Sequence, residues 1–325
     1  MWIRIFGFVV SVVFGLSLIP GEGFSLDYPT REIEFIAPFA PGSSTDSFSR
    51  LAAKFGEKYV GKPIVVVNKT GGGGVLGYST LAAAKPDGYT IGLLAQSVLV
   101  HQYLLKGVTY SYKKDFRVIA QVDYSAEAFF TKKGGPYDIP LKELVKRAKE
   151  RPGAIKIGVG GSVWGAQDFA RAFFEDVANI KLNRVPFPGV SDLIPSVMGG
   201  HVDIAVGPSA EWAPYYKAGQ FSVLAVCMDK RDPRYPDIPT SKELGYDVVL
   251  SAYHWIGTPV KTPDPIIAFL AEAFKKAFAE QGFKDGCDTL GGTAAWEGPE
   301  NSLKTMEKVE QLYMAVIKKF DLKPQ

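Results

Sequence analysis

Three loops rich in glycine and serine are the parts of this sequence best suited to bind a ligand. They span residues 41–46, 71–77 and 160–165, and each follows a predicted strand and precedes a predicted helix. Backbone N–H groups at the start of a helix have no partner within the helix and lie at the positive end of its dipole, so they bind anions. A single loop of this kind is usually an ordinary turn, but three at equivalent positions predict a binding site for a small anion.

These loops do not match the common nucleotide-binding motifs. The four consecutive glycines are followed by Val75 and Leu76, not by the Lys-Ser/Thr pair of a phosphate-binding loop. Gly72, Gly74 and Gly77 fit a dinucleotide fingerprint formally, but a run of glycines makes that match uninformative, and no acidic residue follows about 20 residues later. We therefore expect no cofactor.

A hydrolase is the alternative in another functional class, because the third loop almost contains a nucleophile elbow. Ser162 has the right position in a Gly-x-Ser-x-Gly pattern, but Trp164 replaces the last glycine, and a bulky residue is not expected to adopt that strained turn. The base would have to be His201 or His254, and neither has the spacing of a metal site or a triad; with His101, they are expected to be surface or packed histidines. We predict that the protein is not an enzyme and binds no metal, with a secreted hydrolase using Ser162 as the alternative.

Alternating strands and helices must position the loops. In the N-terminal part, strands are expected at 33–38, 64–67 and 90–94, with helices beginning near residue 43 and spanning 78–84. The pattern returns after residue 125, with helices at 141–150, 167–178 and 192–198 and strands at 155–159, near 185, at 202–206 and at 221–228; long helices follow at 265–281 and 300–320. This alternation predicts doubly wound α/β sheets, in which such loops lie along the carboxyl edge, where ligands bind.

The N-terminus has the layout of a secretory signal peptide. Arg4 precedes an apolar run from Ile5 to Ile19 that is short for a membrane span and interrupted by glycine and serine, and small residues lead up to Ser25. We predict cleavage near Ser25 and a periplasmic protein without a lipid anchor, since no cysteine follows the run. The mature chain of about 300 residues suggests two domains.

Charge and cysteine content narrow the functional classes further. Lysine and arginine total 37 against 34 acidic residues, and this small excess is not gathered in a basic block, so nucleic-acid binding is not indicated. Cys227 and Cys287 are the two cysteines, and an oxidising compartment permits a disulfide between them, which we predict.

Segments in and around the loops resemble the substrate-binding proteins of tripartite tricarboxylate transporters, also called Bug receptors. The matching segments are 37–42 with Asp46 and Arg50, 65–69 leading into the second loop, 85–90, 185–189, 199–203, 224–226, 239–240 and 243–245. The resemblance covers essentially the whole mature chain, and the Pro-Asp-Gly-Tyr-Thr and Gly-Gly-x-Val-Asp segments are fairly specific.

The resemblance implies a type II periplasmic-binding-protein fold, in which two doubly wound α/β lobes close on a ligand. Lobe one would comprise residues 26–124 and 254–325, and lobe two residues 125–253, after a signal peptide at 1–25. The discontinuity of lobe one comes from the resemblance, because periodicity alone would divide the chain once, near residue 130. The implied function is to capture a small carboxylate and deliver it, as a monomer, to a membrane permease.

The resemblance also implies which residues contact the ligand. Main-chain amides and ordered waters of the first two loops would hold the carboxylate, and lobe two would supply selectivity. Carried over by position, the contacts come from Ser43, Ser44, Thr45, Asp46, Gly73, Gly74, Val75 and Ser97 in lobe one and from Ser162, Trp164, Ala166, Gln167, Phe187 and Asp203 in lobe two. Asp46 has a second interpretation, as a cap of the helix that it begins.

The sequence departs from the family pattern in lobe two. Residues 164–168 replace a Gly-Ser-x-x-His stretch, and Phe187 begins a Phe-Pro-Gly segment where Tyr-Lys-Gly is usual. This wall is therefore less cationic and more aromatic, which favours a monocarboxylate or dicarboxylate with an apolar or aromatic body over citrate. We expect Trp164 to pack on that body.

Overall fold

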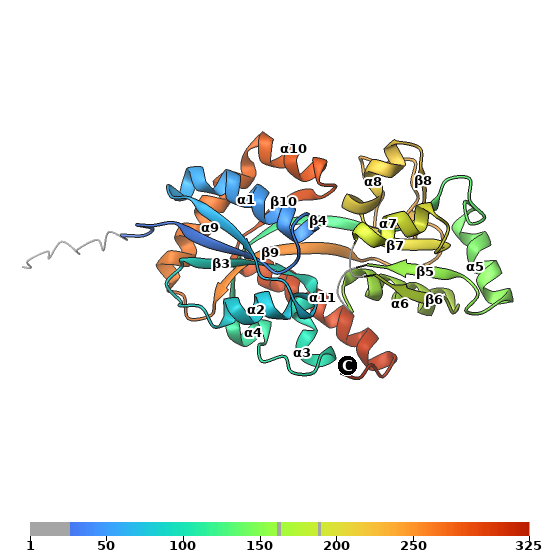
Figure 1. Ribbon diagram of the computed structural model, residues 1–325, viewed down its shortest axis with the longest axis horizontal. Coiled ribbons are helices and arrows are strands. Elements are labelled where there is room, and N and C mark those ends of the chain that lie inside the picture. The colour runs from blue at the N-terminus through green and yellow to red at the C-terminus, as the bar shows by residue number, and fades with distance from the viewer. Residues whose placement is uncertain (1–26, 161–163, 188–189, 325) are drawn as a thin grey trace, which may run out of the picture.

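The structure is a computed structural model that describes residues 27–160, 164–187 and 190–324 (Figure 1). The predicted signal peptide and Ser162 lie outside the described residues. Of the helices that the structure describes, none is both long and apolar enough to cross a membrane.

The first lobe is built on a mixed sheet with the strand order β2-β1-β3-β9-β4. Its parallel strands are β1 (Ile33–Ala37), β2 (Ile64–Asn68) and β3 (Thr90–Ala95), followed by the antiparallel strands β9 (Ser251–Pro259), β4 (Phe116–Lys132) and β10 (Thr293–Glu297). Apolar residues of α1 (Ser44–Val60), α9 (Asp264–Ala279) and α10 (Gln281–Thr289) pack on one face of this sheet. Those of α2 (Val75–Ala82) and α11 (Pro299–Lys319) belong to the cluster on the other face, near the short helices η1 (Gly72–Gly74), η2 (Gln96–Leu99), α3 (His101–Leu104) and α4 (Tyr112–Asp115).

The second lobe repeats this plan with the strand order β6-β5-β7-β4-β8. The parallel strands are β5 (Lys156–Val159), β6 (Asn183–Pro186) and β7 (Ile204–Pro208), and β8 (Phe221–Val226) runs antiparallel to β4. Helices α5 (Leu141–Glu150) and α6 (Ala166–Ala178) cover one face, and α7 (Val190–Met198) and α8 (Ser209–Lys217) cover the other (Figure 1). The predicted fold of two α/β lobes is confirmed.

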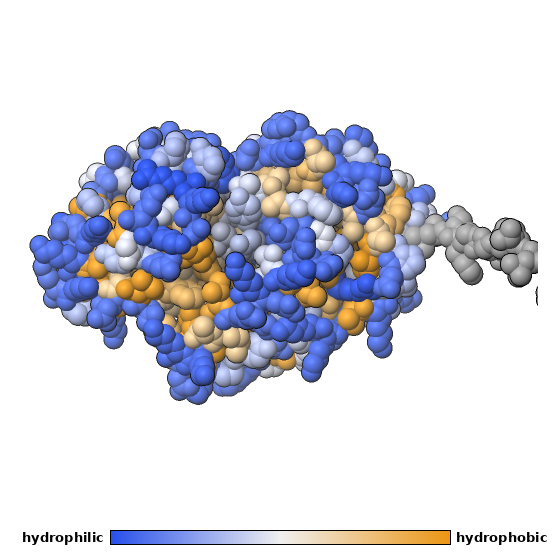
Figure 2. All heavy atoms as spheres, turned by 180° about the vertical axis from the view of Figure 1, so that it is seen from behind, coloured by the Kyte–Doolittle hydropathy of each residue, from blue (hydrophilic) through white to orange (hydrophobic). Residues whose placement is uncertain are grey.

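Two elements connect the lobes. β4 pairs with β9 as far as Ala126 and with β7 from Glu127 onward, so it passes from one lobe into the other within a single strand. α11 lies against both lobes, because Tyr313 stacks on Phe169 of α6 with 3.8 Å between ring centroids. One apolar cluster therefore continues from lobe one into lobe two. From behind, hydrophilic residues cover most of both lobes, and hydrophobic residues gather mainly in the lower middle (Figure 2).

The long strand β4 was not predicted, nor were β9, β10 and α8. β4 is buried along almost its whole length although it contains Gln121, Asp123 and Glu127, so its sequence shows neither a clean alternation nor a continuous apolar run. The predicted disulfide is wrong: both cysteines are free, and Cys227 and Cys287 are buried in two different apolar clusters.

Candidate functional site

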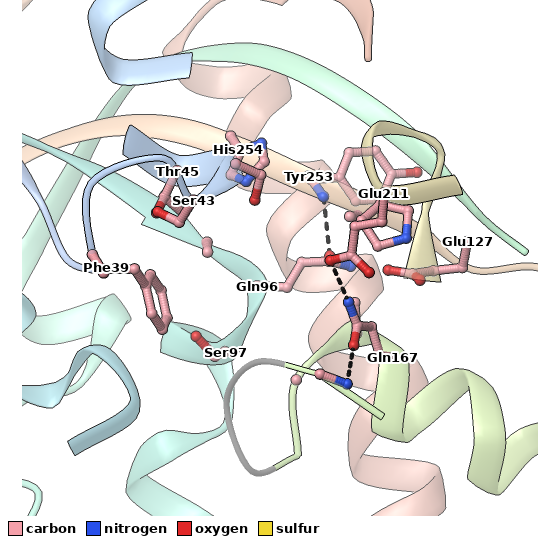
Figure 3. Close-up of a pocket in the computed structure, with 18 of the residues that line it drawn as sticks. Phe39, Ser43, Thr45, Gln96, Ser97, Glu127, Gln167, Glu211, Tyr253 and His254 are labelled. Carbon is pink, nitrogen blue, oxygen red and sulfur yellow. Dashed lines mark hydrogen bonds between the residues drawn. The ribbon is translucent and has the colours of Figure 1, made fainter. Parts of the chain in front are cut away.

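A cavity of about 580 Å³ lies between the lobes, where the inner strands of the two sheets end. On the lobe-one side, it is lined by residues 39–45 after β1 and residues 95–97 after β3. On the other side, it is lined by Gly160 after β5, the start of α6, Pro208 at the end of β7 and the first turns of α7 and α8. β4 contributes Glu127, and β9 contributes residues 252–254 (Figure 3). This volume suits a small organic molecule.

The loop after β1 presents the N-terminus of α1 to the cavity. Ser43 is the N-cap and accepts a hydrogen bond from the Asp46 N–H at 3.3 Å, so Ser44 and Thr45 occupy the first two helical positions. Their N–H groups have no carbonyl partner within the helix. All three residues line the cavity. The loop can therefore offer main-chain donors to an anion, as the sequence suggested.

Asp46 holds this loop together. Its carboxylate accepts hydrogen bonds from the Gly42 N–H and from the side chain of Asn68, both at 2.9 Å, and pairs with Arg50. Burial alone would raise the pKa of Asp46, but the hydrogen bonds from Arg50, Gly42 and Asn68 lower it below its ordinary value. The Asp46 side chain closes the loop and does not line the cavity.

On the lobe-two side, the N-terminus of α6 faces the same cavity. Gly165 is the N-cap, and Ala166 and Gln167 are the first helical residues. The Gln167 side chain accepts a hydrogen bond from the Gly160 N–H at 2.6 Å and donates one to Glu211 at 2.9 Å. Two helix N-termini thus approach the cavity from opposite lobes, and no lysine or arginine is among the described residues that line it.

The second loop does not line this cavity. Gly73, Gly74 and Val75 follow β2, which is the edge strand of its sheet. Gly74 has a φ of +99°, and a Cβ there would lie 2.9 Å from the Tyr78 ring and 3.1 Å from the Phe39 ring. Phe39 itself lines the cavity, so Gly74 lies next to a wall residue but does not line the cavity itself.

Trp164, Phe187 and Asp203 also lie away from this cavity. Trp164 packs near Phe169, with 5.7 Å between ring centroids. Its φ of +56° shows that a tryptophan adopts a left-handed backbone here, but the turn around Ser162 lies outside the described residues.

Phe187 follows the edge strand β6 and packs against the lobe-two core. Asp203 precedes β7 and accepts a hydrogen bond from the Lys156 N–H at 2.7 Å. It therefore lies at the N-terminal ends of β5 and β7, whereas the cavity lies at their C-terminal ends. Of the predicted contact residues, the structure thus brings together Ser43, Ser44, Thr45, Ser97, Ala166 and Gln167 around the cavity.

Sequence reasoning missed two buried glutamates that line the cavity, Glu127 and Glu211. Burial raises the pKa of Glu211 to about 8, and burial together with the nearby Glu211 raises that of Glu127 well above its ordinary value. The signal available for Glu127 is an acidic residue inside the otherwise apolar segment 126–130.

His254 also lines the cavity, and its Nδ1 lies 2.8 Å from the carboxylate of the buried Asp123. His101 is buried and bonded to the Tyr110 hydroxyl at 2.6 Å, whereas His201 is exposed. Within the described ranges, no group of three or more His, Cys, Asp or Glu residues is arranged to hold a metal ion.

Comparison with known proteins places this chain in a family. The family model described as "Tripartite tricarboxylate transporter family receptor" matches residues 48–316. A UPF0065 protein of Cupriavidus necator is 30% identical over 281 residues, which are 85% of this chain and 83% of that protein.

Two solved structures share the fold. The periplasmic binding protein BugD is 25% identical, with a TM-score of 0.82 over 92% of this chain and 100% of the other. An R. palustris protein with adipate is 22% identical, with a TM-score of 0.85 over the same shares, 92% and 100%. The chain belongs to the tripartite tricarboxylate transporter family of receptors.

Proposed function

We propose that the protein is an extracytoplasmic solute receptor that captures a small carboxylate in the cavity between its lobes. The observation that carries this proposal is the N-terminus of α1, which presents the free N–H groups of Ser44 and Thr45 to a cavity that has no lysine or arginine among its described lining residues. A carboxylate at such a site is stabilised by main-chain donors and by the helix dipoles.

The rest of the cavity suits a small organic body. Phe39 and Tyr253 contribute aromatic surface, and Ser97 and Thr45 contribute hydroxyl groups. The R. palustris protein of the same fold holds adipate, which supports a carboxylate as the class of ligand. The family is one of receptors, and the comparisons give the hydrolase alternative no support.

The N–H of Ser44 offers a direct test of binding through the main chain. Proline is tolerated at the first helical position and has no N–H, and Ser43 already has the extended backbone that a following proline requires, with φ −68° and ψ 162°. Ser44→Pro should therefore keep the fold and weaken carboxylate binding by about tenfold, as expected for the loss of one hydrogen bond to a charged group.

Ser44→Ala is the matched control, because it removes the hydroxyl group and keeps the N–H. Thermal-shift screening of the mature protein with a carboxylate library identifies a probe, and calorimetry then compares the two variants. Equal affinities of Ser44→Pro and Ser44→Ala would contradict a main-chain site at α1. Failure of every carboxylate to bind would contradict the proposed function itself.

The proposal includes export and delivery. The mature chain begins near Leu26 after cleavage of the signal peptide, acts as a monomer and passes its ligand to the membrane subunits of a tripartite tricarboxylate transporter. Mass spectrometry and size-exclusion chromatography of the exported protein test the first two statements. An intact Met1 or a stable dimer would contradict them.

A further inference from the structure

Glu127 is a buried carboxyl group in the wall of the cavity. It lies in β4 directly after the point where the strand changes its pairing partner, and it is only 1% exposed. Neither carboxyl oxygen has a hydrogen-bond partner among the described residues. Burying such a group costs several kcal/mol in an ionised state, so Glu127 does not serve the stability of the fold.

Glu211 is a second buried carboxyl group, held in a fixed orientation. Its Oε1 accepts the hydrogen bond from Gln167, whose own Oε1 is occupied by the Gly160 N–H. Its Oε2 has no partner among the described residues. A Cβ on Gly207 would lie 2.3 Å from this oxygen, so the absent side chain of Gly207 leaves the space that the carboxyl group occupies.

The two carboxyl groups lie together on one side of the cavity. Figure 3 shows them next to each other beside Gln167, away from Ser43 and Thr45. The nearby Glu211 raises the pKa of Glu127, and Asp192 is a third acidic residue in the lining. At this end of the cavity, carboxyl oxygens without a partner among the described residues can accept hydrogen bonds, whereas the α1 N-terminus can only donate them.

We propose that the natural ligand carries a nitrogen group that donates hydrogen bonds, preferably an ammonium, at the end opposite its carboxylate, and that this group binds between Glu127 and Glu211. The inference rests on the proposed function and specifies its ligand class. An ammonium group supplies hydrogen-bond donors and a positive counter-charge to the two carboxyl groups. A second carboxylate would bind there only by accepting hydrogen bonds from protonated glutamates.

Ligands of similar length but different end groups distinguish binding of a nitrogen group from binding of a second carboxylate at this end of the cavity. The probes are adipate, its monoamide adipamate, ε-aminocaproate and caproate, together with the shorter succinate and γ-aminobutyrate. Calorimetry on the full mature protein should show that the amino acids bind at least about tenfold more tightly than the dicarboxylates, the scale of one charge-assisted hydrogen bond. Tighter binding of adipate than of both adipamate and ε-aminocaproate would overturn the inference.

Isosteric variants should change the affinities of the amino ligands and of the dicarboxylates differently. Glu127→Gln and Glu211→Gln should each weaken binding of the amino ligands by about tenfold, because the charge is lost. The same changes should leave dicarboxylate binding unchanged or tighter, because glutamine can donate. Asp192→Asn changes the exposed acidic residue of the lining and should have a smaller effect. Melting temperatures confirm that each variant is folded.

Proton release provides a second measurement that does not require variants. Glu211, with its raised pKa, is partly protonated near neutral pH. Binding of an ammonium group should release protons, which calorimetry detects as a dependence of the heat on the ionisation enthalpy of the buffer. Proton uptake with the amino ligands would overturn the inference. If no carboxylate of the library binds, the proposed function fails as well, whereas preferred binding of dicarboxylates defeats only this inference.

Discussion

The buried carboxyl group of Glu211 makes the stability of the folded protein depend on pH. Burial raises its pKa from 4.5 to about 8, although the hydrogen bond from Gln167 opposes this shift. Between these values, the folded chain keeps a proton that the unfolded chain releases. The free energy of unfolding therefore falls with rising pH, by about 1.4 kcal/mol per pH unit for one full proton.

Other buried groups limit the pH range in which the effect of Glu211 on stability can be measured. Burial lowers the pKa of His101 from 6.5 to about 4, so its contribution changes with the opposite sign below pH 6.5. Glu127, with its raised pKa, acts in the same direction as Glu211. Urea denaturation between pH 6.5 and about 8 should show a decline in stability that is reduced in Glu211→Gln. The same decline in both proteins would contradict this assignment.

The two cysteines should react as buried free thiols. Burial raises the pKa of Cys227 and of Cys287, so neither thiol is readily ionised in the folded protein. A thiol reagent should label the two cysteines poorly in the native protein and fully in denaturant without reductant. Labelling that requires a reductant would restore the disulfide prediction.

At the scale of elements, the place of each strand in its sheet decides which loops reach the cavity. β1, β3, β5 and β7 are inner strands, and residues directly after them or at their ends line it. β2 and β6 are edge strands, and neither Gly73–Val75 nor Phe187 lines it. The sequence indicates that a loop follows a strand, but strand order depends on pairing between distant segments. Consequently, the first and third loops could be predicted at the site, and the failure of the second loop to reach this cavity could not.

The same limit explains the missed glutamates. Glu127 reaches the cavity because β4 pairs with β9 and β7, whose residues lie more than 70 positions further along the chain. Local patterns carry no information on such a partner. By contrast, α1, α5 and α6 were predicted within a few residues, because their caps and apolar spacing are local.

The start of α6 is held by a buried ionic network that should be important for stability. Asp168 is almost completely buried and contacts Arg171 at 2.9 Å and Arg184 of β6 at 2.6 Å. Asp168→Asn should destabilise the protein by about 3 kcal/mol, because two arginines lose their shared counter-charge.

Asp176 on the same helix is the matched control. Its contact with the exposed Lys319 is at the surface, so Asp176→Asn should cost less than about 1 kcal/mol. Urea denaturation of both variants compares the costs directly. Similar losses would mean that the Asp168 network does not anchor α6 to β6.

At the scale of the whole molecule, β4 and α11 make the two lobes share one apolar cluster. Such a connection predicts cooperative unfolding of both lobes, although a cavity lies between them. Tyr313 is central to this connection, because it is fully buried and its ring stacks on Phe169 at an interplanar angle of 6°.

The Tyr313 side chain allows the stacking and the hydroxyl group to be tested separately. Its hydroxyl has no hydrogen-bond partner among the described residues. Tyr313→Phe keeps the stacked ring and removes a buried, unpaired polar group, so stability should be unchanged or increased. Tyr313→Ala removes the ring and should cost about 3 to 5 kcal/mol, the usual range for a large buried aromatic side chain. Urea denaturation followed by both fluorescence and circular dichroism measures the two costs. If Tyr313→Phe is as destabilising as Tyr313→Ala, the hydroxyl group and not the stacked ring connects α11 to lobe two.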